Sequence, residues 1–263
     1  MEIAKTRGKE AGVMAIPSED YYDELVPDYT DPWFRKVVDN FEFVGSAELP
    51  PTAKIGHRYT TVVINTPHYL QWLMHQFLSN GGQVKRQSLT CLQEGIPSDA
   101  DAVVHCTGLG ARYLVNDTNV FPTRGQTVII RAPHIKKTVT LMTKNQSTYY
   151  IPRSDGTVVC GGTKEKNDFN PNPEKAIATR ILQRTQALCP EMAGCEIVRH
   201  AVGLRPSRVG GPRIENETIV KPNGEPIIVT HSYGHGGFGV QSSWGAAEFT
   251  VALVEKGIAK SKL

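Results

Sequence analysis

The stretch HSYGHGGFGVQSSWG, from His231 to Gly245, decides how this 263-residue chain is interpreted. It follows an apolar, β-branched run at residues 227–230 and precedes a helical pattern that continues towards the end of the chain. Bare backbone is accessible in this loop because four residues in six are glycine: Gly234, Gly236, Gly237 and Gly239. The free N–H groups and positive dipole end of the following helix favour an anion or an electron-rich carbonyl there.

Other interpretations of this loop are weaker. An ordinary turn needs a positive φ once or twice, so this glycine content favours a ligand-binding loop. Gly-His-Gly-Gly, residues 234–237, also resembles the oxyanion loop of esterases, but that function requires a Gly-x-Ser-x-Gly nucleophile elbow, which the sequence lacks. His231 and His235 are separated by a glycine loop and not by a helical turn, so we expect them to pack or hydrogen-bond and not to bind a metal.

Composition excludes several classes of partner. The formal net charge is +3, so no nucleic-acid or polybasic membrane partner is expected. No apolar run is long enough to span a bilayer, and the first residues lack the apolar region of a signal peptide. The cysteine count is odd and there is no CxxC motif, which predicts buried thiols in a reducing compartment: Cys91, Cys106, Cys160, Cys189 and Cys195.

The chain ends in Ser261-Lys262-Leu263. A terminal S-K-L is a peroxisomal address that an import receptor reads. Three specified residues at one fixed position favour this interpretation over an ordinary basic tail. The sequence therefore predicts a peroxisomal protein.

Turn residues and periodicity predict the elements. Residues 1 to about 50 are expected to be irregular apart from a short strand at 41–44. A helix is expected from Pro67, capped by Asn65 or Thr66, and another after residue 172. Hairpins are expected around residues 154–156 and 223–224. The remaining strands are expected at 59–64, 84–89, 102–106, 127–130 and 197–204.

Five motifs in order carry a family resemblance: VVHCTGLGA (103–111), TRGQT (123–127), YYIPR (149–153), VGLRPSRVGGPRIE (202–215) and HSYGHGGFGVQSSWG (231–245). Together they resemble the D-amino-acid oxidase and D-aspartate oxidase family of peroxisomal flavoenzymes, and its fungal members most. The resemblance runs from about residue 55 to the C-terminus and includes the terminal S-K-L.

The resemblance implies oxidative deamination of D-amino acids to 2-oxo acids, with FAD as the cofactor and oxygen as the acceptor. Hydrogen peroxide and ammonia are released. Catalysis then consists of positioning, with no catalytic residue in the protein itself. Two alternatives stay open: a D-aspartate oxidase, for which Lys164 is a hint, and a non-catalytic family member without bound FAD.

The resemblance also assigns site residues. Arg213 matches the arginine that binds the substrate carboxylate, a role for which a planar guanidinium is suited. Tyr149 matches a tyrosine that donates to the same carboxylate, the carbonyl of Gly237 would receive the substrate amine, and Gln241 would join these hydrogen bonds. The residues matched to cofactor binding are Gly108, Gly110, Arg208, Gly236, Gly237, Phe238, Gly239, Val240 and Gln241.

The predicted architecture is mixed α/β. An incomplete FAD-binding, Rossmann-like domain is expected at residues 64–125 and 226–263, and a mainly antiparallel substrate domain at 1–63 and 126–225. The dinucleotide motif Gly-x-Gly-x-x-Gly that opens family members is absent from the sequence, so the chain is expected to begin partway into the family pattern. The sequence leaves the oligomeric state open, with a homodimer as one option.

Overall fold

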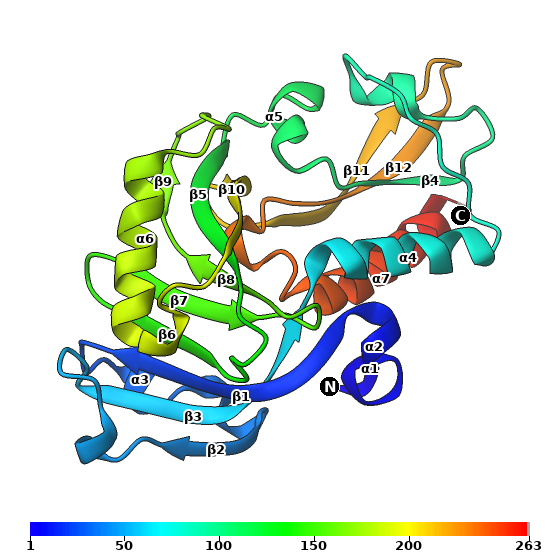
Figure 1. The fold of residues 1–263 in the computed structure, drawn as a ribbon. Helices are drawn as coiled ribbons and strands as arrows, with labels where there is room; N and C mark the ends of the chain where they lie inside the picture. Colours follow the sequence, from blue (N-terminus) through cyan, green and yellow to red (C-terminus); the bar gives the residue numbers. More distant parts are fainter. Residues whose placement is uncertain (262–263) are drawn as a thin grey trace. The chain divides into compact units, whose positions relative to one another are not determined.

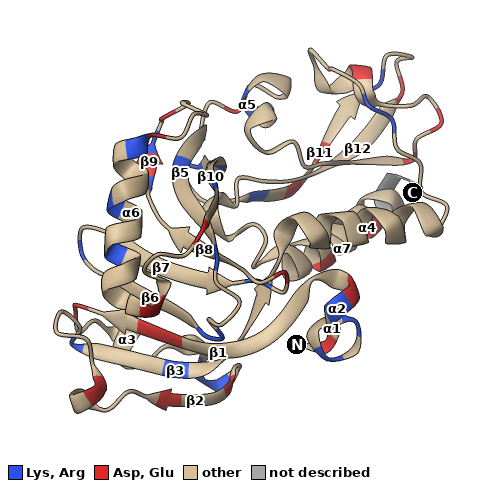
Figure 2. Ribbon diagram, in the orientation of Figure 1, with Lys and Arg blue, Asp and Glu red and all other residues tan. Residues whose placement is uncertain are grey.

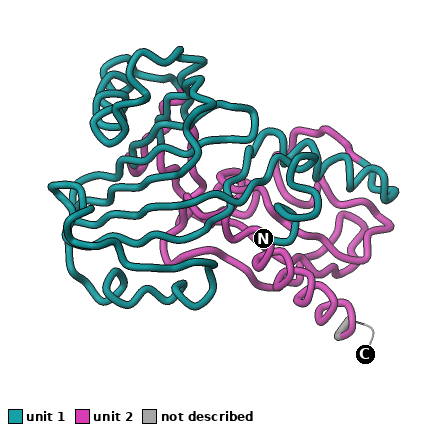
Figure 3. The backbone as a smooth tube through the Cα atoms, turned by 60° about the horizontal axis from the view of Figure 1, so that its bottom comes forward, with its two compact units in different colours: residues 1–83, 125–164, 172–202 teal, residues 84–124, 165–171, 203–263 magenta. Residues whose placement is uncertain are grey.

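The computed structural model describes residues 1–261, with the backbone alone at residues 260 and 261. Two compact units divide the chain (Figure 3). Unit 1 comprises residues 1–83, 125–164 and 172–202, and unit 2 comprises residues 84–124, 165–171 and 203–263. The division into an FAD domain and a substrate domain at the residues given above stays a prediction. The predicted Ser261-Lys262-Leu263 address extends beyond the described residues.

Unit 1 is built on a large sheet in which most neighbours are antiparallel, β1 and β6 being a parallel pair (Figure 1). The strand order is β10-β5-β8-β7-β6-β1-β3-β2. Strands β5 and β10 also contribute residues to unit 2. The bounds are β1 Val13–Tyr22, β2 Asp39–Phe43, β3 Ile55–Ile64, β5 Val120–Arg131, β6 Thr138–Met142, β7 Ser147–Pro152, β8 Thr157–Gly161 and β10 Ile197–Arg208.

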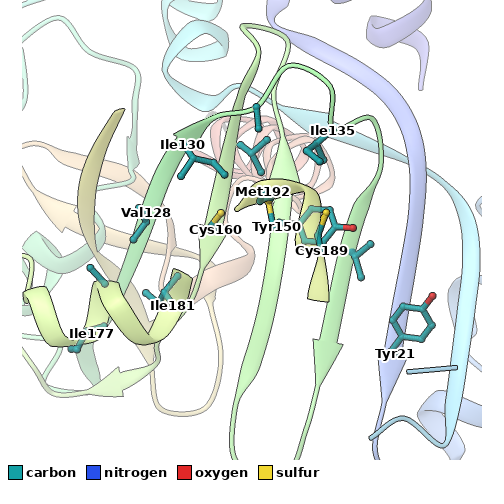
Figure 4. Packing of buried hydrophobic residues seen from close by; sticks show 14 of the residues in the cluster. Tyr21, Val128, Ile130, Ile135, Tyr150, Cys160, Ile177, Ile181, Cys189 and Met192 are labelled. Carbon is teal, nitrogen blue, oxygen red and sulfur yellow. The ribbon is translucent and has the colours of Figure 1, made fainter. Parts of the chain in front are cut away.

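The core of unit 1 lies between this sheet and helix α6 (Lys175–Leu188). Buried and partly exposed residues alternate along β7, whereas most residues of β5 and β8 are buried. Val128 from the sheet and Ile181 from α6 lie in this core (Figure 4). Both are completely buried, as is Val158 of β8. Burial of such side chains contributes about 1.5–3 kcal/mol each to folding.

Two sequence expectations were wrong. Residues 1 to about 50 contain the ten-residue strand β1, which local pattern does not reveal because Pro17 and a polar Ser-Glu-Asp triplet interrupt it. Its pairing with β3 and β6 stabilises it instead. Residues 84–89 form no strand, and Val84 is exposed, so this segment has no apolar face buried against a neighbour.

The predicted helix after residue 65 is confirmed as α4 (Thr66–Ser79), with Asn65 as its N-cap residue. The side chain of Asn65 makes no capping hydrogen bond and donates to Asp155 instead. Tyr69 and Trp72 pack with α2 (Gly8–Ala11) and the start of β1. The helix after residue 172 and both predicted hairpin turns are also confirmed.

Unit 2 contains a three-stranded sheet in the order β11-β12-β4, with bounds Arg213–Val220, Pro226–Tyr233 and Ala102–His105. The β11–β12 pair is an antiparallel hairpin, and β4 runs parallel to β12. Helix α7 (Ser243–Ser261) packs on one face, where Asn216 Nδ2 donates to the carbonyl of Leu253. The mixed α/β fold predicted from the sequence is confirmed.

The remaining α-helices and the remaining strand are short: α1 Glu2–Thr6, α3 Pro27–Thr30, α5 Ala111–Leu114 and β9 Glu165–Lys166. Basic and acidic residues are interspersed along the elements of both units (Figure 2). Within residues 1–261, no helix combines the length and apolarity required to cross a bilayer. All five cysteines are free, and Cys106 is exposed, which corrects the expectation that each is buried.

Candidate active site

The glycine loop lies where the sequence predicts, between the end of β12 at Tyr233 and the start of α7 at Ser243. Gly234 and Gly236 have φ of 87° and 57°, which L side chains rarely adopt. A Cβ atom on Gly234 would lie 2.8 Å from Cβ of Arg208. Glycine is therefore required at this position for two reasons, backbone conformation and close packing.

The second glycine turn meets the same part of β10. Gly108, with φ of 57°, packs against Pro206, and Gly236 packs against the next residue, Ser207. Ser207 also pairs with His235 in an isolated β-bridge. The structure thus brings together two predicted cofactor segments that are more than 100 residues apart in the sequence.

The loop presents backbone and apolar side chains to its surroundings. Gly237 and Gln241 are exposed, and so are three large apolar side chains, those of Phe238, Val240 and Trp244. Nε2 of His235 is buried without a hydrogen-bond partner, and burial lowers the pKa of this histidine. A planar, partly polar group seated on the loop would cover this apolar surface.

Arg213 opens β11 directly opposite Tyr233, and its side chain is 19% exposed. Each guanidinium nitrogen has a partner: Nε donates to Glu215 Oε1 at 2.7 Å, one terminal nitrogen to Tyr233 Oη at 3.1 Å and the other to Glu217 Oε2 at 2.9 Å. Although burial lowers its pKa, these hydrogen bonds raise the pKa above the usual arginine range. Arg213 is therefore a fixed cation whose fork is already engaged by two glutamates.

A chain of hydrogen bonds continues from Glu217 into the interior of unit 2. Glu217 Oε2 lies 2.9 Å from Nε2 of His231, the two Nδ1 atoms of His231 and His105 lie 2.9 Å apart, and Nε2 of His105 lies 2.6 Å from Thr107 Oγ1. Each contact can carry one proton. If His231 donates to Glu217, then His105 Nδ1–H donates to His231 and Thr107 donates to His105. Both buried imidazoles are neutral in this arrangement.

Burial lowers the pKa of both histidines. For His105, burial together with nearby His231 and Arg213 lowers the pKa to about 4. For His231, burial outweighs the hydrogen bond to Glu217, which acts in the opposite direction. The pair is thus neutral near pH 7, and the predicted hydrogen-bonding role of His231 is confirmed.

A second set of hydrogen bonds lies beside the glycine loop. The hydroxyl of Tyr233 donates to Asp117 Oδ2 at 2.9 Å, and Nε of Arg208 donates to the same oxygen at 2.8 Å. Arg208 also donates to the carbonyls of Val209 and Gly211. Arg208 therefore braces the turn beside the glycine loop, and direct contact of its side chain with a cofactor stays a prediction.

Tyr149 belongs to unit 1, whereas Arg213 belongs to unit 2. The ring of Tyr149 lies over Gly161, where an added Cβ would clash with the ring, so a larger residue at position 161 would have to displace it. Strand register places Tyr149, Thr140 and Asp20 side by side on the sheet face opposite α6. Asp20 accepts a 2.6 Å hydrogen bond from Tyr59, and burial raises the pKa of this carboxyl. The joint action of Tyr149 and Arg213 on one substrate stays a prediction.

Sequence reasoning missed the residues around Arg213, namely His105, Asp117, Glu215, Glu217 and Tyr233. A signal was present, because Arg213, Glu215 and Glu217 alternate along one strand and share a face. Lys164, the predicted hint of acidic substrates, is exposed. Within the described part of the chain, no three His, Cys, Asp or Glu side chains are grouped to hold a metal ion.

Comparison with known proteins places this chain in a family. Residues 8–253 match the model of a family described as FAD dependent oxidoreductase. The chain belongs to this family. The D-amino-acid oxidase of Rubrobacter xylanophilus is 39% identical over 225 residues, covering 85% of this chain and 67% of that protein. The D-amino-acid oxidase of Schizosaccharomyces pombe is 35% identical over 263 residues, covering 95% and 74%.

Other members of the family are also similar. Human D-aspartate oxidase is 33% identical over 249 residues, covering 94% of this chain and 71% of that protein. Among solved structures, glycine oxidase from Geobacillus kaustophilus superposes with a TM-score of 0.74 at 20% identity, covering 97% and 76%. The structural likeness shows a shared fold, and the sequence resemblance to this oxidase family is confirmed.

Proposed function

We propose that this chain is an FAD-dependent oxidase of D-amino acids. The observation that carries the proposal is the fixed cation Arg213 beside the glycine loop, in a chain 35–39% identical to D-amino-acid oxidases over most of its length. A D-amino acid, oxygen and water would yield a 2-oxo acid, ammonia and hydrogen peroxide.

The residues of unit 2 fit FAD. The two glycine turns provide bare backbone, the exposed Phe238 and Val240 provide apolar surface, and His235 provides an unpartnered ring nitrogen. We propose that Gly108, Gly110 and the segment 236–241 hold the cofactor. Bound FAD would supply the oxidising power by accepting hydride from the substrate Cα, and oxygen would restore it.

The protein's own contribution would be to hold the substrate in one orientation. Arg213 would bind the carboxylate, Tyr149 would donate to it, and the carbonyl of Gly237 and the side chain of Gln241 would face the amine. Glu215 is 59% exposed and has no other hydrogen-bond partner among the described residues, so it can leave Arg213 for water at small cost. We therefore propose that a substrate carboxylate replaces Glu215.

Peroxide production tests this function directly. The purified chain would be assayed with saturating FAD and either D-alanine or L-alanine, beside its Arg213→Lys variant, which keeps the charge but loses the fork. We expect peroxide with D-alanine alone and a KM raised at least tenfold in the variant. A chain that retains bound flavin but forms no peroxide from any D-amino acid would refute the proposal. A chain that binds no flavin would favour the non-catalytic alternative.

A preference for acidic substrates is the second candidate, supported by the human D-aspartate oxidase similarity and by the exposed cation Lys164. The ratio of kcat/KM for D-aspartate and D-alanine would be measured in wild type and in Lys164→Ala. A lower ratio in the variant supports a pairing between Lys164 and the substrate side chain. An unchanged ratio removes Lys164 as a support for the acidic preference.

We also propose a peroxisomal location, supported by the terminal Ser261-Lys262-Leu263. A fluorescent protein fused to the N-terminus should enter peroxisomes with this tripeptide and remain outside without it. Equal distribution of the two fusions would contradict the proposal. Light scattering of the purified protein would test whether the chain forms a homodimer.

A further inference from the structure

Unit 1 contains a pocket of about 340 Å³, open to solvent, that uses none of the residues assigned above to the substrate or cofactor site. We call it the Arg153 cavity. The first turn of α4, the β7–β8 hairpin, β5 and the start of β10 line it. Its lining consists of Asn65, Pro67, His68, Gln71, Ile129, Arg153, Asp155, Thr157, Val198 and Arg199.

Two guanidinium groups in this lining lack partners. Among the described residues, neither Arg153 nor Arg199 forms a side-chain hydrogen bond or an ion pair within 4.0 Å. Arg153 is half-buried, and its pKa is lowered by burial and by the proximity of Arg199, an effect that Asp155 opposes. A half-buried cation costs free energy unless it is paired, so its site gains stability when an anion binds.

The acidic residue of the cavity, Asp155, is hydrogen-bonded to residues other than the two arginines. Asp155 Oδ1 accepts hydrogen bonds from the backbone and hydroxyl of Thr157, and Oδ2 accepts one from Asn65. Burial raises the pKa of Asp155, but these hydrogen bonds outweigh burial and lower the pKa below its usual value, so Asp155 remains a carboxylate. The cavity therefore holds two guanidinium cations and one carboxylate, with His68 as a further titratable group.

The helix geometry reinforces this charge balance. Because the Asn65 side chain is used by Asp155, α4 begins without a side-chain cap. The N-terminus of a 14-residue helix therefore adds unpaired N–H groups and a partial positive charge beside Arg153. This contribution is secondary to that of the two guanidinium groups.

We propose that the Arg153 cavity binds a phosphate group, either free or on a small phosphomonoester. A guanidinium pairs with a phosphate through parallel hydrogen bonds, and two such groups complement a dianion. The cavity volume lies within the range of small-molecule sites and exceeds that of phosphate alone, which leaves room for a short organic substituent.

Isothermal titration of the full chain, with FAD present, would measure the binding of inorganic phosphate and of glycerol 3-phosphate at fixed ionic strength. We expect saturable binding, weakened about tenfold or more by Arg153→Gln and less by Arg199→Gln, since a charge-assisted hydrogen bond is lost in each. Arg180→Gln, which alters an exposed arginine on α6, is the matched control and should bind as wild type does. Tighter binding of glycerol 3-phosphate would identify a phosphomonoester site, and equal binding a site for phosphate itself.

A variant that binds phosphate more tightly than wild type would show that weaker binding in the arginine variants is not caused by misfolding. Asp155→Asn removes the only carboxylate in the lining, so it should tighten phosphate binding about threefold or more, which a damaged fold would not do. The proposal is overturned if wild type shows no saturable binding up to about 50 mM phosphate, well above the millimolar range of weak specific sites. Equal affinities for wild type, Arg153→Gln and Asp155→Asn would also overturn it.

Discussion

Acidification should destabilise this protein through the buried pair His105 and His231. Both imidazoles are neutral in the folded chain, and a protonated His231 would place two N–H groups against each other at the 2.9 Å Nδ1–Nδ1 contact. His105 is 2% exposed, and burial, His231 and Arg213 lower its pKa from 6.5 to about 4. Because the unfolded chain binds protons more readily, stability falls as the pH drops below about 6.5.

The size of the effect follows from linkage. A pKa of about 4 in the folded state and 6.5 in the unfolded state gives a loss of about 2 kcal/mol between pH 7 and pH 5 from His105 alone. This window lies above the usual pKa of glutamate, 4.5, so the lowered pKa of Glu217 adds little there. His231 contributes in the same direction.

Urea unfolding followed by tryptophan fluorescence at pH 7, 6 and 5 would measure this loss. His105→Asn retains a donor towards His231 but does not titrate. The variant's free energy of unfolding should therefore fall by about 2 kcal/mol less between pH 7 and pH 5 than that of wild type. His200→Asn, which changes an exposed histidine, should keep the full loss. If wild type and His105→Asn lost the same free energy of unfolding, the buried neutral pair would not be the cause.

Three further changes test other parts of the structure. Glu215→Gln removes an exposed carboxylate that competes for Arg213, so steady-state kinetics should show KM for D-alanine lowered about two- to fivefold. An unchanged KM would contradict the proposal that the substrate carboxylate replaces Glu215 on Arg213. Tyr149→Phe should raise this KM about fivefold through the loss of one hydrogen bond, and an unaltered KM would remove Tyr149 from the site. Ile181→Ala, at a fully buried site, should cost about 2–5 kcal/mol in urea unfolding, whereas Val251→Ala, at an exposed site, should stay within about 0.5 kcal/mol; similar losses would refute the assigned core.

The parts of the fold that sequence predicts are those with local causes. Asn223-Gly224 specifies a turn on its own, since Gly224 takes a φ of 90° that other residues avoid. The turn then fixes the register that sets Arg213 opposite Tyr233. Strand β1, in contrast, is stabilised by pairing with β3 and β6, which are distant from it in the sequence. The residues around Pro17 therefore do not show why a proline is tolerated in this strand.

The same distinction separates the predicted and missed parts of the site. The glycines of residues 234–239 are visible in sequence because four of them stand together. The contact between His105 and His231 joins residues 126 positions apart, and each histidine alone is unremarkable in sequence. The cavity at Arg153 likewise depends on Asn65 and Asp155, which are 90 positions apart.

The two glutamates on Arg213 are not equivalent, and this difference determines how a carboxylate can bind there. Glu217 also accepts from Nε2 of His231, a side chain that is completely buried. Removing Glu217 would leave that donor unsatisfied, at a cost of about 1–3 kcal/mol. Glu215 has no second partner among the described residues and is largely exposed, so its departure costs less. An incoming carboxylate should therefore take the Nε side of the guanidinium, while Glu217 keeps Arg213 and the histidine pair in place.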